Sequence, residues 1–204
     1  MSFVHLHNHT HFSLLDAAAS PQSMIDAAVK DGQKALAITD HGVMFGCFEF
    51  YKKAKKAGVK PIIGCEVYIA VKKHTDREKV QDAGKKRNYY HLVLLAKNET
   101  GYRNLIKLTS IGHTAGYYYK PRIDMDLLRE YHEGLIATSA CLAGPINAPM
   151  LAGDEATARR NAITLKEIFG EDFYIELQDH GLPEDRHVLE FAPRLAKELG
   201  IRLV

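Results

Sequence analysis

Short apolar runs alternate with amphipathic stretches along most of the chain. The apolar runs have the length of strands, and the longer stretches have helical periodicity. The predicted strands cover residues 3–7, 35–39, 60–70, 91–97, 135–140, 172–178 and 201–204. The predicted helices cover residues 20–32, 45–58, 99–116, 124–134, 154–170 and 183–200. Strands that alternate with helices are typical of a parallel sheet, so the pattern predicts a closed or distorted α/β barrel of seven strands.

Two segments depart from this pattern. Residues 72–88 are polar, charged and without periodicity, and we predict a mobile surface insertion there. Residues 134–153 carry no charge and approach the length of a membrane span. Pro145 and Pro149 would break a helix in this segment, so it predicts a buried strand with a turn and no membrane association.

The overall composition is that of an ordinary globular protein. The formal net charge of +2 over 204 residues is too small to indicate nucleic acid or an anionic membrane as partner. Cys47, Cys65 and Cys141 are widely spaced, which argues against a disulfide framework and favours a reducing, cytoplasmic location. No signal peptide is visible at the start of the chain.

Histidine is unusually frequent and is concentrated near the start of the chain. His5, His7, His9 and His11 occupy every second position of the segment that begins with the first predicted strand. In an extended segment these side chains point to one face. A row of imidazoles is a poor core face but a good set of metal ligands.

Further residues of ligand type lie in the strands or where they end. They are Asp40 and His41 after the second strand, Glu66 in the third, Cys141 after the fifth, and Asp179 and His180 after the sixth. In α/β folds with parallel strands, functional groups gather where strands end, so we expect these side chains on a common rim. The set exceeds the needs of one ion, which predicts two or three divalent ions (Zn, Mn or Fe) and phosphoester hydrolysis.

Each residue also has a simpler interpretation. Asp40 could cap the following helix or support a ligand from behind, and Cys141 alone is more often a small buried hydrophobe. His91 begins its strand, at the end away from the expected rim, and its position alone favours a core histidine. The remaining histidines are expected to be solvated; they are His74, His113, His132 and His187.

Several motifs together resemble a known family. They are HLHNHT, SLLDAA, ALAITDHG, KPIIGCEVY, HLVLLAKNETGYRNLIKL, KPRIDMDLL, EGLIATSACLAG and ELQDHGLPE. They resemble the PHP (polymerase and histidinol phosphatase) domain, in the form found at the N-terminus of bacterial replicative DNA polymerase III alpha subunits. The resemblance covers residues 1–204 as one domain and implies a distorted, TIM-like barrel of seven strands. It also implies a site of nine ligands for up to three metal ions.

Seven of these ligands have counterparts here. The resemblance places them at His7, His9, Asp16, His41, Glu66, His91 and Cys141. The resemblance overrules the positional argument against His91 as a ligand. It gives no ligand role to His5 or His11. His180 lies in a motif typical of the polymerase group and is interpreted as a residue that supports the ligands. The family's last two ligands come from an Asp-x-His motif beyond Val204. We therefore expect a fragment of a longer polymerase, in which fewer than three ions bind or bind loosely.

The resemblance leaves two functions open. One is a metal-dependent phosphoesterase, in this context a 3′–5′ proofreading exonuclease within a DNA-directed DNA polymerase (a nucleotidyltransferase). The other is a structural module with a vestigial metal site that docks a separate exonuclease subunit. A stand-alone phosphatase is disfavoured by the motifs NETGYRNLIKL and KPRIDMDLL. The implied partners are DNA, through the full-length polymerase, and the remaining polymerase domains in cis.

One segment offers a weak sign of contact with nucleic acid. Residues 116–122, GYYYKPR, combine aromatic rings with Lys120 and Arg122, a combination that binds single strands. The alternative is that the tyrosines pack this loop against the barrel.

Overall fold

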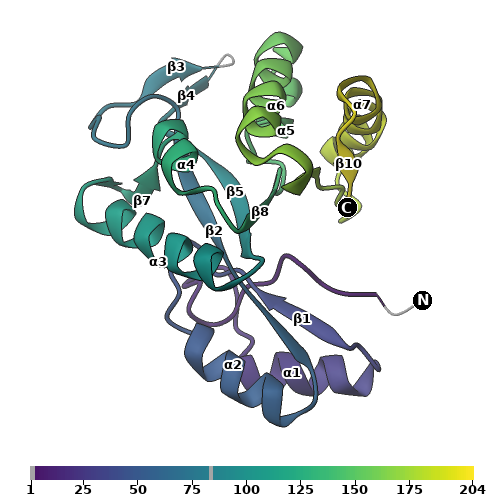
Figure 1. Ribbon diagram of the computed structural model, residues 1–204. Coiled ribbons are helices and arrows are strands. Elements are labelled where there is room, and N and C mark those ends of the chain that lie inside the picture. The colour runs from purple at the N-terminus through teal and green to yellow at the C-terminus, as the bar shows by residue number, and fades with distance from the viewer. Residues whose placement is uncertain (1–2, 83–84) are drawn as a thin grey trace.

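A strongly curled sheet, covered by helices on its outer side, forms the body of the protein (Figure 1). The computed structural model describes residues 3–82 and 85–204. The sheet follows the order β10, β9, β8, β5, β2, β7, β6, and β1 pairs with the first part of β2. Within the described residues the two outer strands of this order do not pair with each other, so the sheet is a half barrel. The predicted distorted α/β barrel is confirmed in this form.

Six of the seven predicted strands are present. Four further strands occur, which pair as β3 with β4 and β6 with β7. The large sheet contains β1 (Ala35–Ile38), β2 (Lys60–Ala70), β5 (Tyr89–Ala96), β6 (Tyr117–Tyr118), β7 (Lys120–Ile123), β8 (Leu135–Thr138), β9 (Phe173–Ile175) and β10 (Arg202–Leu203). A separate hairpin contains β3 (Val80–Asp82) and β4 (Lys85–Arg87).

The expectation of an all-parallel sheet is wrong at two strands. β5 runs antiparallel to both of its neighbours, β2 and β8, and the short β6 runs antiparallel to β7. The pairs β1–β2, β2–β7, β8–β9 and β9–β10 are parallel. Where it is described, the connection from β2 to β5 contains the β3–β4 hairpin and no crossover helix. A parallel pair needs such a crossover, so β5 returns along β2 in the opposite direction.

The predicted strand at residues 3–7 does not form regular strand structure. This segment runs extended along β1, where the amide nitrogen of Ala37 donates to the carbonyl of His5 at 3.0 Å. The chain then turns at residues 10–16, where the amide nitrogen of Ser13 donates to the carbonyl of Thr10. His5 and His11 are consequently exposed, while His7 and His9 point inward.

The predicted helices are all present, with one short addition. They are α1 (Pro21–Lys30), α2 (Cys47–Lys56), α3 (Glu99–Thr114), α4 (Met125–Tyr131), α6 (Glu155–Phe169) and α7 (Pro183–Leu199). The additional helix is α5 (Asn147–Leu151), and a single 3-10 turn covers Gly170–Asp172. α7 continues through Pro193 as one helix.

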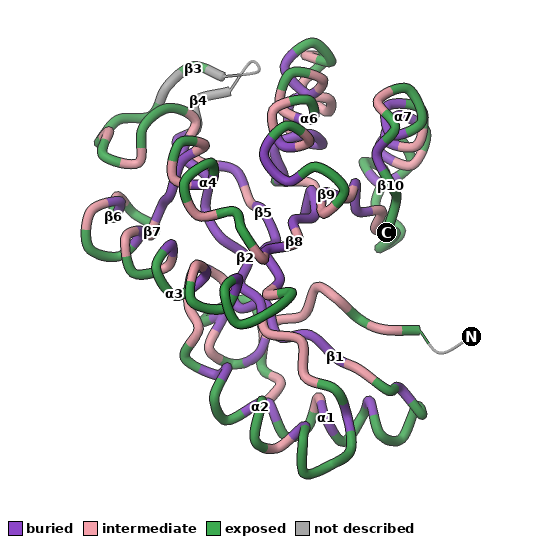
Figure 2. Tube along the Cα trace, in the orientation of Figure 1, coloured by how far each residue is buried: buried purple, intermediate pink, exposed green. Residues whose placement is uncertain are grey.

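Buried residues follow the strands of the sheet and the helix turns beside them (Figure 2). Apolar side chains lie on both sides of the sheet. The largest cluster lies between the outer face of β2, β5 and β8 and helices α3, α6 and α7. A second cluster packs β1 against α1 and α2, and a small one, built around Val93 and Leu95, lies on the concave side. Residues 134–153 form β8, a turn and α5, as the prediction of a buried strand required. No helix in the described part of the chain is long and apolar enough to cross a membrane.

Residues 72–88 hold more structure than the sequence suggested. His74 contacts Asp124 through its ring Nδ1 at 2.6 Å, and the buried guanidinium of Arg122 donates to the carbonyl of His74 at 2.9 Å. This part of the segment is thus bound to the ends of β7 and α4. The mobility of the segment stays a prediction, and its residues 83–84 lie outside the described residues.

The prediction of solvated histidines is right for three of the four. His113, His132 and His187 are exposed, although His113 also places its ring Nε2 2.9 Å from the carbonyl oxygen of Gly42. His74 is half-buried against Asp124, so the prediction is wrong for this residue.

Candidate metal centre

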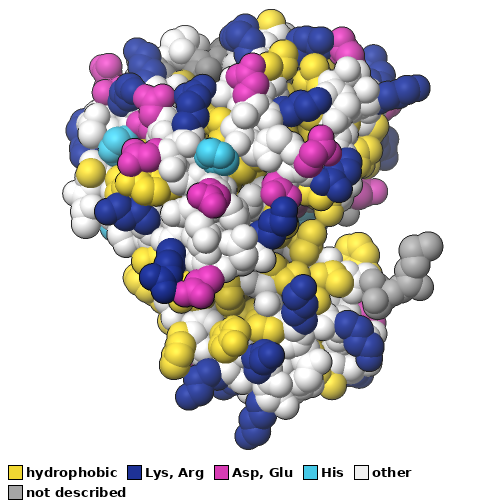
Figure 3. Space-filling model, viewed as in Figure 1, with side chains coloured by type: hydrophobic (Ala, Val, Ile, Leu, Met, Phe, Trp, Pro, Cys, Tyr) yellow, Lys and Arg dark blue, Asp and Glu magenta, His cyan; other side chains and the backbone are white. Residues whose placement is uncertain are grey.

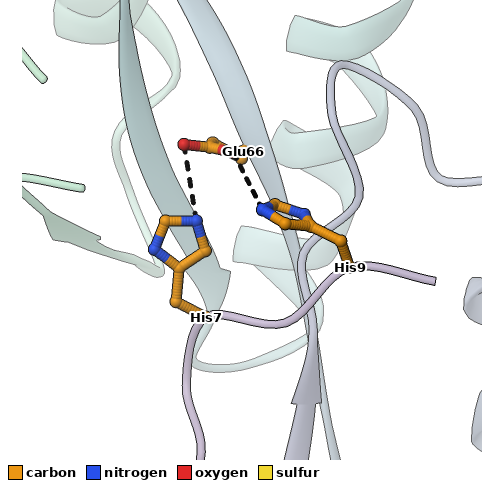
Figure 4. A group of neighbouring side chains, drawn as sticks. All are labelled: His7, His9 and Glu66. Atoms are coloured by element: carbon orange, nitrogen blue, oxygen red, sulfur yellow. Dashed lines mark ion pairs between the residues drawn. The ribbon is translucent and has the colours of Figure 1, made fainter. Parts of the chain in front are cut away.

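Glu66 of β2 lies at the centre of a cluster of four histidines. Its carboxylate is 1% exposed. The ring nitrogens closest to it are Nε2 of His7 at 3.4 Å, Nε2 of His9 at 3.3 Å, Nδ1 of His41 at 2.8 Å and Nδ1 of His91 at 3.0 Å. Figure 4 shows the rings of His7 and His9 pointing toward this carboxylate from the extended N-terminal segment. Four imidazoles thus share one buried acid.

The turn at residues 10–16 brings Asp16 to the same place. One carboxylate oxygen of Asp16 lies 3.1 Å from Nε2 of His41 and 3.8 Å from Nε2 of His9. Leu15, directly before Asp16, has a φ of 68°, a left-handed conformation that is unfavourable for leucine. The side chain of Leu15 itself is fully exposed. Asp16 is half exposed and borders the solvent side of the cluster.

Asp40 is the buried anchor of this turn. Its carboxylate accepts hydrogen bonds from the amide nitrogen of Thr10 at 2.6 Å, the hydroxyl of Thr10 at 2.8 Å and the hydroxyl of Ser13 at 2.7 Å. The N-cap of the next helix, α2, is Gly46. The helix-cap interpretation of Asp40 is therefore wrong, and the residue instead supports the segment that carries His9 and Asp16.

His91 reaches the cluster because its strand is reversed. In the antiparallel register of β2 and β5, His91 lies opposite Tyr68, two residues from Glu66. The first residues of β5 therefore lie beside the part of β2 that carries Glu66. The positional argument against His91 assumed a parallel strand, and this assumption is why it was wrong.

Cys141 lies at the edge of the cluster. Its Sγ is 3.9 Å from both Oε1 of Glu66 and Nδ1 of His91. Ala140, the residue before it, has a φ of 57° and is fully buried, so surrounding packing holds this conformation in place. Burial and the nearby Glu66 carboxylate raise the pKa of the Cys141 thiol to about 12.

Six of the seven predicted ligands form three overlapping groups with metal-ligand spacing. The groups are His7, His9 and Glu66; His9, Asp16 and His41; and His41, Glu66 and His91. Within each group the ligand atoms lie within 4.8 Å of one another. Shared members join the groups, as expected for a site with more than one ion.

Unpartnered polar atoms test whether metal ions fit this site. In the described part of the chain, two cluster atoms, His41 Nδ1 and Glu66 Oε2, are buried and have no hydrogen-bond partner. His41 Nδ1 and Glu66 Oε2 are close, but their orientation is not that of a hydrogen bond. Buried polar atoms without partners are rare in folded proteins, and these belong to residue types that bind divalent ions. The residues present therefore fit metal ions.

Charge coupling stabilises the ionised forms of several groups in the metal-free cluster. Burial disfavours the charged form of His7, but hydrogen bonds to Glu176 and Glu66 outweigh it and raise the pKa of His7 to about 10. Burial opposes ionisation of Glu66 as well, yet its close contacts with the rings of His41, His7 and His91 hold its pKa far below the usual range. Burial lowers the pKa of His9.

Glu176 is a member of this neighbourhood that the sequence analysis missed. Its Oε1 lies 2.8 Å from Nδ1 of His7, on the opposite side of the ring from Glu66. Glu176 directly follows β9, so the rule that placed Asp40 and His41 at the rim could have found it. His180 is exposed, and its backbone nitrogen donates to Asp185, so the structure gives no support to a role behind the ligands.

Comparison with known proteins is consistent with this arrangement. The family described as PHP domain matches residues 5–180. DNA polymerase III subunit alpha of Borreliella burgdorferi is 50% identical over 201 residues, which cover 98% of this chain and 17% of the relative. The Treponema pallidum subunit is 49% identical and covers all of this chain. The chain thus spans about a sixth of the length of these relatives.

Solved structures share the fold at low sequence identity. An amidohydrolase from Chromobacterium violaceum superposes with a TM-score of 0.58 at 15% identity, over 98% of this chain and 84% of the other. A protein of Bifidobacterium adolescentis described as a metal-dependent phosphoesterase gives 0.58 at 14% identity, over 98% of this chain and 85% of the other. With the family match and the 50% identical relative, these findings place the chain in the PHP domain family, in the form that occurs in DNA polymerase III alpha subunits.

Proposed function

We propose that residues 1–204 are one PHP domain whose cluster binds divalent metal ions and hydrolyses phosphoesters. The observation that carries the proposal is the contact of one buried carboxylate, Glu66, with four imidazoles. The proposed ligands are His7, His9, Asp16, His41, Glu66 and His91, with Cys141 at the edge. Mixed imidazole and carboxylate ligands suit Zn, Mn and Fe, and the complete family site would hold up to three ions.

Different residues of the chain would have different roles in hydrolysis at such a site. Divalent ions, when bound, supply an activated water and stabilise the charge on the leaving oxygen. Glu66 belongs to two of the three groups of ligands, and both of its oxygens face imidazoles, so it would help to hold the ions of both groups. Asp16 is exposed enough to meet solvent, so a substrate would approach from its side. Asp40 keeps the Asp16 turn in place without facing the substrate.

For the whole protein we propose a DNA polymerase III alpha subunit in the cytoplasm. This chain would act with the remaining polymerase domains in cis, and its substrate would be the 3′ end of single-stranded DNA. The activity would then be 3′–5′ proofreading. The support is the 50% identity to a polymerase III alpha subunit over 98% of this chain.

A second candidate function is docking of a separate exonuclease subunit, with the metal site vestigial. The observation that favours it is an exposed apolar surface near the cluster. Phe45 and Phe48 are 71% and 73% exposed, and the ring of Phe12, from the Asp16 turn, contacts that of Phe45. In Figure 3, hydrophobic side chains are visible on the lobe built by α1 and α2, between lysines and arginines.

Metal content and digestion of DNA decide between these functions. We would measure bound Zn, Mn and Fe, and nucleotide release from a single-stranded 3′ end, for this chain and for a full-length alpha subunit that contains it. Glu66→Gln should remove both metal and hydrolysis, whereas the surface variant Glu49→Gln should remove neither. Full metal occupancy without hydrolysis in the full-length subunit would favour docking. Unchanged metal content in Glu66→Gln would refute the proposed site.

A further inference from the structure

Glu176 contacts His7 from the side that faces away from the other candidate ligands. Its Oε1 is 2.8 Å from Nδ1 of His7, while Nε2 of the same ring lies 3.4 Å from Glu66. The carboxylates of Glu66 and Glu176 therefore contact opposite nitrogens of the same imidazole ring. Glu176 belongs to none of the three groups with metal-ligand spacing, so its role differs from that of Glu66.

Four polar contacts fix the position of Glu176. Besides His7, its carboxylate accepts hydrogen bonds from the amide of Gln178 at 2.6 Å and from the hydroxyl of Thr138. Its backbone nitrogen donates to the hydroxyl of Ser139 at 2.9 Å. Thr138 ends β8, which pairs directly with β9, so two neighbouring strands hold the carboxylate. A group buried and bonded in this way has one orientation toward His7.

These contacts determine which nitrogen of His7 carries a hydrogen. An ionised carboxylate can only accept, so the 2.8 Å contact requires Nδ1 of His7 to donate. Nε2 of Gln178 lies 3.1 Å from the same Nδ1, but its shorter contact, at 2.6 Å, is the hydrogen bond that it donates to Glu176. In the neutral ring, the lone pair is then left on Nε2, which faces Glu66 and His9.

We propose that Glu176 is a positioning residue of the metal centre, which holds His7 so that Nε2 points at the ion. The proposal rests on the proposed metal-binding function. Metal-bound histidines commonly donate their other N–H to a carboxylate, which fixes the ring and makes it a stronger ligand. His9 offers the contrast, because its Nδ1 has no hydrogen-bond partner within the described residues. His7 is thus the better-fixed of the two neighbouring rings.

The test is a double-mutant cycle on metal affinity in the full chain. Zn²⁺ affinity would be measured by competition with a chromophoric chelator for wild type, Glu176→Gln, His7→Gln and the double variant. Glu176→Gln should weaken the affinity about 10- to 100-fold, because removal of such a partner has this effect in other metal sites. In the His7→Gln background, the same change should have little further effect, since Glu176 acts through His7.

A matched control separates positioning from support of the fold. Asp124 is also a buried carboxylate bonded to an imidazole, that of His74 at 2.6 Å, but it lies outside the candidate metal centre. Asp124→Asn should lower the unfolding temperature and leave Zn²⁺ affinity unchanged. A second readout is the Nδ1–H resonance of His7 in the Zn²⁺-loaded protein, which Glu176→Gln should shift.

The outcomes distinguish this inference from the proposed function. Wild-type protein that binds none of Zn²⁺, Mn²⁺ and Fe²⁺ would overturn both. Normal Zn²⁺ binding that Glu176→Gln leaves unchanged would overturn the positioning role alone. Additive losses in the double variant would do the same, because they would show that Glu176 acts independently of His7.

Discussion

The ring of Tyr68 in β2 packs against the ring of His91 in β5, with 5.1 Å between ring centroids and an edge-to-face geometry. The two residues are direct partners in the antiparallel register. Tyr68 also stacks on His41 at 6.0 Å and is itself buried. One tyrosine therefore supports two candidate ligands that come from different loops and strands.

Replacing Tyr68 should weaken the metal site as well as the fold. Tyr68→Leu removes the ring that orients His41 and His91, and we expect a loss of about 2–4 kcal/mol in the free energy of unfolding together with weaker Zn²⁺ binding. Chemical denaturation and a chelator competition assay measure the two effects. Tyr90→Leu is the control, since Tyr90 is equally buried but belongs to the core cluster on the helix-covered side. An equal loss of Zn²⁺ affinity in both variants would argue against the specific role of Tyr68.

Gly42, directly after His41, should tolerate no side chain. Its φ is 66°, and an added Cβ would lie 2.8 Å from Cγ of Pro121. Gly42→Ala should therefore cost at least about 2 kcal/mol, from the left-handed conformation and the collision together. Gly32→Ala isolates the first contribution, because Gly32 has a φ of 72° with nothing within 4 Å, and should cost only about 1 kcal/mol. Urea denaturation of both variants checks the difference; equal losses would show that the collision is relieved by movement of Pro121.

The sequence predicted elements better than their directions. Apolar runs and helix caps such as Ser20 are local signals, and the corresponding strands and helices form where expected. The reversal of β5 depends on how the chain returns from β2, and alternation of strands and helices carries no such information. The absence of a predicted helix between residues 70 and 89 was the available signal. Histidine at every second position of residues 5–11 was also misleading, because this segment lies beside β1 but does not form a regular strand.

The candidate site was predictable as a set of residues and much less as a geometry. His7, His9, His41 and Glu66 follow from the position of ligand-type residues near strand ends, and the structure brings them together. Asp16 and His91 required the family resemblance, since one lies on an irregular turn and the other on the reversed strand. The supporting roles of Asp40 and Glu176 depend on hydrogen bonds between distant segments, which periodicity does not reveal.

Stability of the metal-free protein should fall as pH rises above neutrality. The pKa of His7 is raised from 6.5 to about 10 in the folded state by its bonds to Glu176 and Glu66, against the effect of burial. Between these two values the folded state binds a proton that the unfolded state has lost, so each increase in pH favours unfolding. The contribution of His7 is fully present below pH 6.5 and disappears as pH passes 10.

Urea denaturation in the presence of a chelator, from pH 6.5 to 8.5, tests this dependence. This window lies below the ordinary pKa of 9.0 for the cysteine thiols, whose raised values would add a similar trend at higher pH. The decline should be smaller in His7→Asn, which lacks the titrating ring. A slope that is identical in wild type and His7→Asn would show that His7 does not carry the raised pKa.

Tyr119 should provide a stacking surface for single-stranded DNA. Its ring is 69% exposed, its φ of 61° is unfavourable for tyrosine, and the ammonium group of Lys79 lies 5.8 Å from the ring centroid. The neighbouring Lys120 lies over the ring of Tyr68, which stacks on His41, so this loop lies close to the metal cluster. The packing interpretation of this loop holds for Tyr118, whose ring lies against Arg122. Tyr119 contacts the ring of Tyr118 with one edge, but most of its own ring stays exposed.

Tyr119→Ala should weaken the binding of a fluorescent single-stranded oligonucleotide, measured by anisotropy. Loss of one stacked base costs about 1–3 kcal/mol, which corresponds to roughly 5- to 150-fold in affinity. Tyr51→Ala on α2 is the control, because Tyr51 is 47% exposed but belongs to another surface. The binding should also weaken with salt, since the lysines beside the ring would contact phosphates. Equal affinity of wild type and Tyr119→Ala at low salt would contradict this role, and it would do so without bearing on metal binding, because the assay can be run with the metal removed.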